Sequence, residues 1–351
     1  MDGTQEPHRK RANAGNPVGP RRNPDEVVAQ VVREYYDLGE VGMPVPVPGA
    51  HQRRHRKLII EASAGRFLVK TYKRDLRELD ALRFQHRLSD HLHEHDLPVA
   101  RIIRAKDGKG IVELKDWALE VQSFVEGEPM RVTRHTLIVA SKAQGRFHDV
   151  CRDFPRPQRE ARMWRFSEVP RENFGRLFEK ARAEADTPEL TEQCNTIALF
   201  LRDAAKTLDW DARGEFETGL IHGDWHGGNL FFHNDELVGI LDLEFAGEGC
   251  FLEDLAYAIS NLCIRTTADE KILAERTNIL LDNYQLSRQL SYAEEVALYY
   301  AVGVKHVTSV CLQMEQFGER VAGHSATEWM DLLAAQCAWL AQRAQQARWR
   351  T

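Results

Sequence analysis

The 351-residue sequence lacks the features of a secreted, membrane-embedded or nucleic-acid-binding protein. Its six cysteines include no Cys-x-x-Cys pair, and no apolar run approaches the roughly 18 residues that a membrane-spanning helix needs. Its 47 lysines and arginines are outnumbered by 53 acidic residues, and a net charge of −6 does not favour general binding to nucleic acid. We therefore expect a cytoplasmic protein with reduced thiols and with neither a nucleic-acid nor a membrane partner.

The N-terminal segment 1–23 has no apolar stretch of the kind found in secretory signals. It combines arginine and lysine with glycine, proline and asparagine, which predicts a disordered basic tail, with a docking arm as the alternative. Asn23 then offers a helix cap, and Pro24 suits the first helical position. We expect the folded part of the chain to begin at this point.

The pattern of predicted elements changes near residue 125. Before it, strand-like runs at 57–62 and 66–72 form a hairpin, a helix covers 77–95, and three further short strands follow at 101–105, 110–114 and 117–124. After it, helices are expected at 136–150, 190–208, 252–263, 270–284, 292–313 and 327–347, interrupted by short strands and turns over 220–249. These expectations define an α+β fold with a small β-rich lobe over 24–125 and a larger, mainly helical lobe over 126–351.

The stretch of strands and turns at 220–249 carries the chemically informative residues. Phosphoryl transfer needs an attacking oxygen held in line and a neutralised phosphate charge, while Mg²⁺ prefers hard oxygen ligands. Asn229 and Asp242 would supply two such ligands if a hairpin brought them together, and Asp224 would be able to accept a hydroxyl proton. The pattern therefore indicates an ATP-dependent phosphotransferase that uses magnesium.

These residues stand in the stretch HGDWHGGN, followed by ILDLE, which resembles the aminoglycoside phosphotransferase and homoserine kinase-like family, relatives of the protein kinases. The resemblance implies a two-lobed kinase-like fold, with Asp224 as the catalytic base or the acid that orients the acceptor. It implies that Asn229 and Asp242 bind Mg²⁺. Glu244 matches a second acid with a metal-binding or supporting role, and His222 matches a residue that braces the loop.

Further matches concern the nucleotide. Lys70, within Arg66-Phe67-Leu68-Val69-Lys70, resembles the strand lysine that contacts the α- and β-phosphates of ATP. The expected acidic partner of this lysine is less well defined: Gln85 stands at the aligned position, and Glu78 is the candidate. The segment 122–127 resembles the hinge whose backbone binds adenine. The adenine-binding candidates are Ser123, Phe124 and Val125.

The sequence departs from protein kinases in ways that favour a small acceptor. Gly223 replaces the arginine of His-Arg-Asp, Asp242 is followed by Leu243-Glu244, and no Ala-Pro-Glu follows. We expect the acceptor to be a hydroxylated small molecule such as an amino sugar, an amino alcohol or a related metabolite. An atypical Ser/Thr protein kinase and a non-catalytic nucleotide-binding protein are the alternatives.

Two other groups of residues allow different interpretations. Histidines that alternate with other residues suggest a metal site, either a binuclear metallohydrolase or zinc. Those residues are His222, Asp224 and His226 in the first case and His91, His93 and His95 in the second. Several acids would attract a cationic acceptor, although a solvated surface is the simpler interpretation. They are Glu126, Glu128, Glu248 and Glu253.

Overall fold

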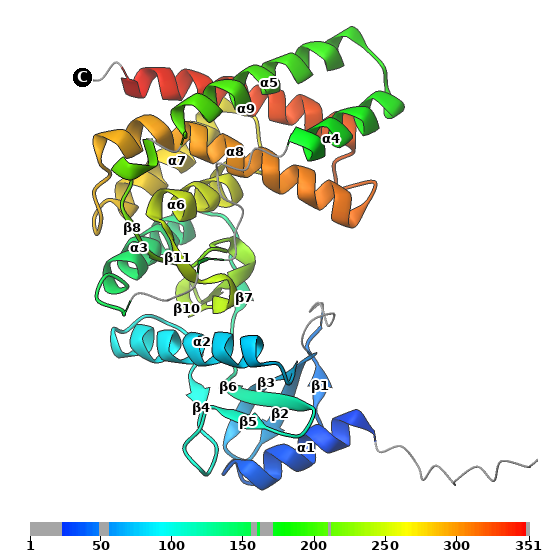
Figure 1. Cartoon of the computed structure of the whole chain (residues 1–351), viewed down its shortest axis with the longest axis vertical. Helices are drawn as coiled ribbons and strands as arrows, with labels where there is room; N and C mark the ends of the chain where they lie inside the picture. Colours follow the sequence, from blue (N-terminus) through cyan, green and yellow to red (C-terminus); the bar gives the residue numbers. More distant parts are fainter. Residues whose placement is uncertain (1–22, 49–55, 156–159, 162–170, 210–211, 349–351) are drawn as a thin grey trace, which may run out of the picture.

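The computed structural model describes residues 23–48, 56–155, 160–161, 171–209 and 212–348. It confirms the α+β fold, with a small β-rich lobe and a larger helical lobe (Figure 1). The predicted basic tail, apart from Asn23, lies outside the described ranges. Asn23 caps the first helix as predicted, because its side chain accepts a hydrogen bond from the Asp25 N–H at 3.0 Å.

The small lobe is built on one antiparallel sheet with the order β1-β2-β3-β6-β4, and β5 also pairs with β6. Its strands are β1 (Val45–Pro46), β2 (Arg56–Ala62), β3 (Gly65–Lys73), β4 (Ile102–Ile103), β5 (Ile111–Glu113) and β6 (Trp117–Ser123). The predicted hairpin is confirmed as β2 and β3, which pair from Ala62–Gly65 back to Arg56–Thr71.

The two faces of this sheet have different partners because side chains alternate along a strand. On β3, Phe67 and Val69 face a core formed with α1 (Pro24–Tyr35). The opposite face of β3 carries Lys70 and Tyr72, and Tyr72 packs with residues of α2 (Leu76–Glu94). In Figure 1, α1 lies on the far side of the sheet, whereas α2 lies between the sheet and the helical lobe. Lys70 is thereby directed to the side of the sheet that faces the rest of the protein.

The helical lobe contains the largest hydrophobic core. Its helices are α3 (Arg134–Val150), α4 (Arg171–Glu184), α5 (Pro188–Thr207), α6 (Phe251–Ile259), α7 (Glu270–Tyr284), α8 (Tyr292–Phe317) and α9 (Ala326–Arg348). α6 continues as a π-helix over Ser260–Ile264. The sequence did not predict α4, which buries only Phe174, Leu177 and Ala181 and so has a weak apolar pattern. No helix in the described ranges combines the length and apolar character needed to cross a membrane.

The strands of segment 220–249, together with the short strand β7, form two small sheets. The first sheet has the order β10-β9-β7, and the second pairs β11 with β8. The strands are β7 (Glu128–Pro129), β8 (Thr218–Ile221), β9 (Leu230–His233), β10 (Glu236–Ile240) and β11 (Gly247–Cys250). The loop from His222 to Asn229 leads into β9, and Asp242 follows β10, so the antiparallel hairpin brings both to one end of the sheet.

Candidate active site

A cavity of about 450 Å³ lies between the two lobes. Apolar side chains line it, among them Val47, Leu68, Ile102, Phe231 and Ile240. The predicted hinge residues Ser123, Phe124 and Val125 also line it, as do Lys57, Lys70, Asn229 and Asp242. The cavity therefore combines an apolar wall with two cations, an amide and a carboxylate, which suits a ligand with a flat ring and phosphates.

The carboxylate of Asp224 is fixed from three sides. Asn229 Nδ2 donates to Asp224 Oδ2 at 2.9 Å and to the Asp224 backbone oxygen at 3.0 Å, while the Tyr257 hydroxyl donates to Oδ1 at 2.9 Å. His226 Nε2 lies 3.4 Å from Oδ2. Burial raises the pKa of Asp224, but His226, His222 and Tyr257 outweigh burial and hold the pKa below its usual value. Asp224 is thus an oriented, ionised carboxylate.

His222 connects the Asp224 loop to the strand end that carries Asp242. Its Nδ1 accepts a hydrogen bond from the Asp224 N–H at 3.2 Å, so its Nε2 carries the proton and donates to the Leu241 oxygen at 3.0 Å. Burial lowers the pKa of His222, which keeps the ring neutral. This geometry matches the predicted bracing role. Metal binding by His222 would require one free ring nitrogen, and backbone groups occupy both here.

Gly223 allows the same loop to approach the segment after β10. Its φ of 80° lies in the left-handed region, and a Cβ there would come within 2.8 Å of the Phe245 backbone oxygen. A side chain at this position would separate the loop from the Asp242 segment. The glycine of His-Gly-Asp is therefore explained by a close approach of two backbones.

Asp254, at the start of α6, supports the loop from below. Its Oδ1 accepts from the Gly223 N–H at 2.8 Å, and its Oδ2 accepts from the His222 N–H at 3.3 Å. Oδ2 also accepts from His148 Nε2 at 2.9 Å. Burial raises the pKa of Asp254, but these donors outweigh it and hold the pKa low, so a buried carboxylate is fully satisfied. Asp254 therefore has a structural role as the support of this loop.

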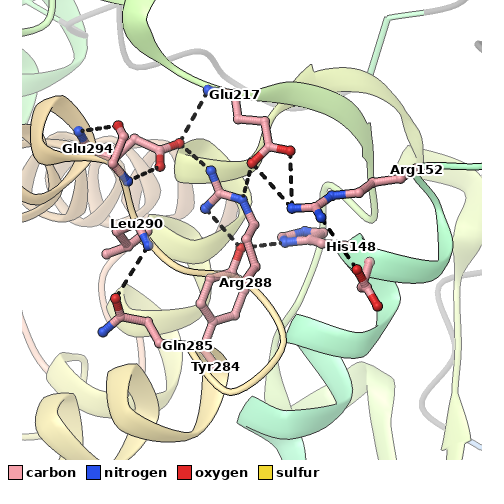
Figure 2. Close-up of polar contacts among 10 residues, drawn as sticks. His148, Arg152, Glu217, Tyr284, Gln285, Arg288, Leu290 and Glu294 are labelled. Atoms are coloured by element: carbon pink, nitrogen blue, oxygen red, sulfur yellow. Dashed lines mark hydrogen bonds and ion pairs between the residues drawn. The ribbon is translucent and has the colours of Figure 1, made fainter.

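The support extends through the helical lobe by a chain of buried polar contacts. His148 Nδ1 accepts from the Tyr284 hydroxyl at 2.8 Å, and Tyr284 in turn accepts from Arg288 Nη1 at 3.3 Å. Arg288 Nε donates to the Glu217 carboxylate and Arg288 Nη2 donates to the Glu294 carboxylate, as Figure 2 shows. The active-site loop is thereby tied, through Asp254, to α3, α7 and the start of α8.

Two lysines converge on Asp242. Lys57 Nζ lies 3.1 Å from Oδ2, and Lys70 Nζ lies 3.9 Å from Oδ1. Burial raises the pKa of Asp242, but the two lysines reverse this effect and lower the pKa to about 2. Glu244 shares a hydrogen bond with Asp242, and its own pKa is raised by burial and then by the charge of Asp242. The sequence prediction missed Lys57, although its register opposite Lys70 in the hairpin was a usable signal.

The sheet brings an acid other than the predicted Glu78 next to Lys70. Glu78 lies in the first turn of α2, where its N–H donates to the Asp75 side chain at 3.4 Å. The acid directly opposite Lys70 in the sheet is Glu120 of β6. Glu120 is buried and accepts from the Tyr72 hydroxyl at 2.6 Å and from His86 of α2. Glu120, which the sequence prediction did not consider, is therefore a second candidate partner for Lys70.

The predicted hinge residues lie at the C-terminal end of β6 and directly after it. The Ser123 N–H donates to the Arg101 oxygen at 2.9 Å, and the Phe124 N–H donates to the Arg66 oxygen at 3.2 Å. Arg66 lies over the Phe124 ring at 5.3 Å and pairs with Glu126 at 2.9 Å. These contacts fix the segment beside the cavity.

Two of the three histidines considered for zinc, His91 and His95, contact backbone carbonyl groups. His91 Nε2 lies 3.0 Å from the Val150 oxygen, and His95 Nδ1 lies 2.8 Å from the His91 oxygen. Within the described residues, no three His, Cys, Asp or Glu side chains are grouped as metal ligands. The structure gives no support to zinc at this helix end.

A β-rich lobe and a helical lobe around a cleft with these groups define a protein-kinase-like phosphotransferase. The chain belongs to the Phosphotransferase enzyme family (APH), which matches residues 45–288. It is therefore an ATP-dependent small-molecule kinase. It is 27% identical over 279 residues to a homoserine kinase of Methylobacterium nodulans, covering 78% of this chain and 80% of that protein.

Solved structures have the same fold at low sequence identity. A microcompartment-associated aminopropanol kinase has a TM-score of 0.66 and 17% identity, covering 92% of this chain and 98% of that one. The amicoumacin kinase hAmiN, solved with AMP-PNP, Ca²⁺ and Ami, has a TM-score of 0.63 and 15% identity, covering 92% and 94%. These similarities establish the arrangement of the lobes.

Proposed function

We propose that this kinase transfers the γ-phosphate of ATP to the hydroxyl of a small amino alcohol or hydroxylated amino acid. The observation that supports this proposal is that Asn229 and Asp242 line one cleft and that the Asp224 carboxylate is bonded to the Asn229 side chain. The Asn229 side-chain amide is bonded to Asp224, and the Leu241 N–H, adjacent to Asp242, donates to the Asn229 backbone oxygen at 2.8 Å. The relatives named homoserine kinase and aminopropanol kinase support an acceptor that bears both a hydroxyl and an amine.

Asp224 is assigned to the acceptor. Its ionised carboxylate is held by Tyr257 and Asn229, so it can orient an acceptor hydroxyl without reorganising. In the transfer, a bond forms between the acceptor oxygen and the γ-phosphorus, and the bond to the ADP oxygen breaks. The hydroxyl proton passes to Asp224. Because phosphoryl transfer has a loose transition state, that proton moves late.

Asn229 and Asp242 are assigned to Mg²⁺, with Glu244 as a further acid at the same place. The donor set fits, because a carboxamide and carboxylates are the hard oxygen ligands that magnesium prefers. Both hydrogens of the Asn229 amide are used by Asp224, which leaves its oxygen for a cation. When bound, magnesium would supply neutralisation of phosphate charge.

Lys70 and Lys57 are assigned to the phosphates. In the structure both cations contact Asp242, and a polyphosphate in the cleft would offer them further negative charge. The adenine ring would lie against Leu68, Ile102 and Phe231. Since the Ser123 and Phe124 N–H groups are used within the sheet, the adenine edge would meet the backbone carbonyls of the hinge and the Val125 N–H. The role predicted for Glu78 remains a weaker proposal than one for Glu120.

The test is ATP consumption against a panel of hydroxylated amines, hydroxylated amino acids and aminoglycosides, each with magnesium. We expect ADP formation to depend on at least one amino alcohol or hydroxylated amino acid, with the phosphate recovered on its hydroxyl oxygen. ADP release that is the same with and without every member of the panel would refute the proposed acceptor class.

A further inference from the structure

The surface that leads away from Asp224 is a polar stripe on α6 and its π-helical continuation. From Phe251 to Arg265 every residue is buried except Tyr257, Asn261 and Arg265. These three recur at a spacing of four, so they share one side of the helix. The Tyr257 hydroxyl contacts Asp224 directly, and Asn261 Nδ2 donates to the Tyr257 backbone oxygen at 3.0 Å. The stripe thus begins at the proposed catalytic carboxylate and ends at Arg265.

Arg265 is a partly buried cation with neutral partners. Its Nη1 donates to Ser309 Oγ at 3.3 Å, its Nη2 donates to Gln313 Oε1, and its Cζ lies 5.7 Å from the centre of the Trp329 ring. No carboxylate pairs with it among the residues that the structure describes. Burial lowers the pKa of Arg265, because the buried guanidinium has lost contact with water. A guanidinium held in this way is suited to a carboxylate ligand.

The π-helix contributes to the position of Arg265. The Arg265 N–H donates to the Ser260 oxygen, five residues earlier, at 3.1 Å. Such wide turns are rare and occur frequently at functional sites. Gln336 of α9 closes this turn, since its Nε2 donates to the Ile264 and Thr267 oxygens, each at 2.9 Å. Several buried contacts therefore fix the position of this one arginine.

Arg265 also acts electrostatically on the group that holds Asp224. Burial and the charge of Asp224 raise the pKa of Tyr257, and the Arg265 charge opposes that rise. The step of eight positions from Tyr257 to Arg265 corresponds to about 12 Å along an α-helix. A small acceptor with its hydroxyl at Asp224 would extend along the stripe toward Arg265.

The acids that would attract a purely cationic acceptor lie elsewhere. Glu253 is buried on α6, with its Oε1 4.0 Å from Lys305 Nζ, and Glu126 pairs with Arg66 in the small lobe. The stripe itself contains a phenol, an amide and a guanidinium but no carboxylate. Its charge is therefore positive, which is opposite to what a simple amino alcohol requires.

We propose that Arg265 binds the carboxylate of the acceptor, and that the substrate is a hydroxylated amino acid and not the corresponding amino alcohol. This inference rests on the proposed kinase function and specifies its substrate class. The phosphoryl transfer is unchanged: the acceptor hydroxyl gives its proton to Asp224 and receives the γ-phosphoryl group from ATP. Arg265 contacts only the far end of the acceptor.

The test compares three pairs of acceptors that differ only by a carboxylate. The pairs are serine and ethanolamine, homoserine and 3-aminopropan-1-ol, and threonine and 1-aminopropan-2-ol. With wild-type protein and magnesium-ATP, we expect kcat/KM for the preferred amino acid to exceed that of its amino alcohol at least about tenfold. R265M should lower kcat/KM for that amino acid about 10- to 100-fold and leave the amino alcohol within about twofold.

Two further variants separate binding from structure. R276M removes a nearby arginine on α7, whose Nη1 contacts Thr266 Oγ1 at 3.1 Å, and should leave both members of a pair unchanged. R265K should restore part of the amino-acid activity. Equal losses on both members of a pair in R265M, or a wild-type preference for the amino alcohols, would overturn the role of Arg265 while leaving the kinase function intact. If no member of any pair is phosphorylated, the acceptor class proposed above falls, and the role of Arg265 falls with it.

Discussion

His306 of α8 should make the protein sensitive to acid, because it is buried in a form that cannot take up a proton freely. The Gln336 amide nitrogen is used by two carbonyl groups, so its oxygen must accept from His306 Nε2, at 2.8 Å. His306 Nδ1 then accepts from the Ser260 hydroxyl at 3.1 Å. Burial, followed by the charge of Arg265, lowers the pKa of His306 from 6.5 to about 4.

The size of the effect follows from these two pKa values. Above pH 6.5 the ring is neutral in both the folded and the unfolded chain, and its titration has no effect on stability. As the pH falls through 6.5, the unfolded chain takes up a proton that the folded chain does not, so the free energy of unfolding decreases. The loss amounts to about 2 kcal/mol at pH 5 and about 3 kcal/mol at pH 4.

The assay is urea unfolding of wild-type protein and H306N at pH 7.5 and pH 5.0. The substitution itself will reduce stability at both pH values, because it removes buried contacts, but only the change between the two pH values tests the titration. We expect that change to be smaller by about 2 kcal/mol in H306N. H233N, at an exposed position on β9, serves as the control and should retain the wild-type pH dependence. An unaltered pH dependence in H306N would refute the assignment of His306 as a buried neutral ring.

Two other predictions concern the site and its support. K57M should raise the Kd for magnesium-ATP about tenfold or more, because it removes one of two cations at the phosphates. K73M, at the exposed end of β3, is the control and should leave the Kd unchanged. Equal affinities of K57M and wild-type protein in isothermal titration would contradict the role of Lys57. D254A should lower the free energy of unfolding by about 3–5 kcal/mol, since it leaves three buried donors unsatisfied, and a loss below about 1 kcal/mol in urea unfolding would show that the brace is unimportant.

The sequence was sufficient for the fold wherever periodicity was strong. The hairpin of β2 and β3 and the predicted helices corresponding to α2, α3 and α5 to α9 are present because apolar spacing and turn residues agreed with each other. α4 was missed because it buries few residues. The π-helical end of α6 was also missed, since it depends on contacts from α9 that no local pattern contains.

The same distinction applies to the candidate site. The residues of His-Gly-Asp and the strand end at Asp242 were found because they are close in sequence and share one hairpin. Tyr257, Lys57 and Glu120 were missed because each reaches the site from another element, by helix packing or strand register. Arg265 gave no signal in the sequence, because its neutral surroundings exist only after α6, α8 and α9 have packed together.

The central claim is that a nucleotide-bound metal site at Asp242 lies beside the Asp224 carboxylate, which orients the acceptor hydroxyl. Comparing D224A with D242A tests this claim most directly. Titration calorimetry with ATP, with and without magnesium, should be combined with turnover of the preferred acceptor. D224A should bind magnesium-ATP with near wild-type affinity and lose turnover by orders of magnitude, whereas D242A should lose both turnover and the magnesium-dependent part of ATP binding. Near-normal turnover in D224A, or undiminished magnesium-dependent binding in D242A, would contradict the account.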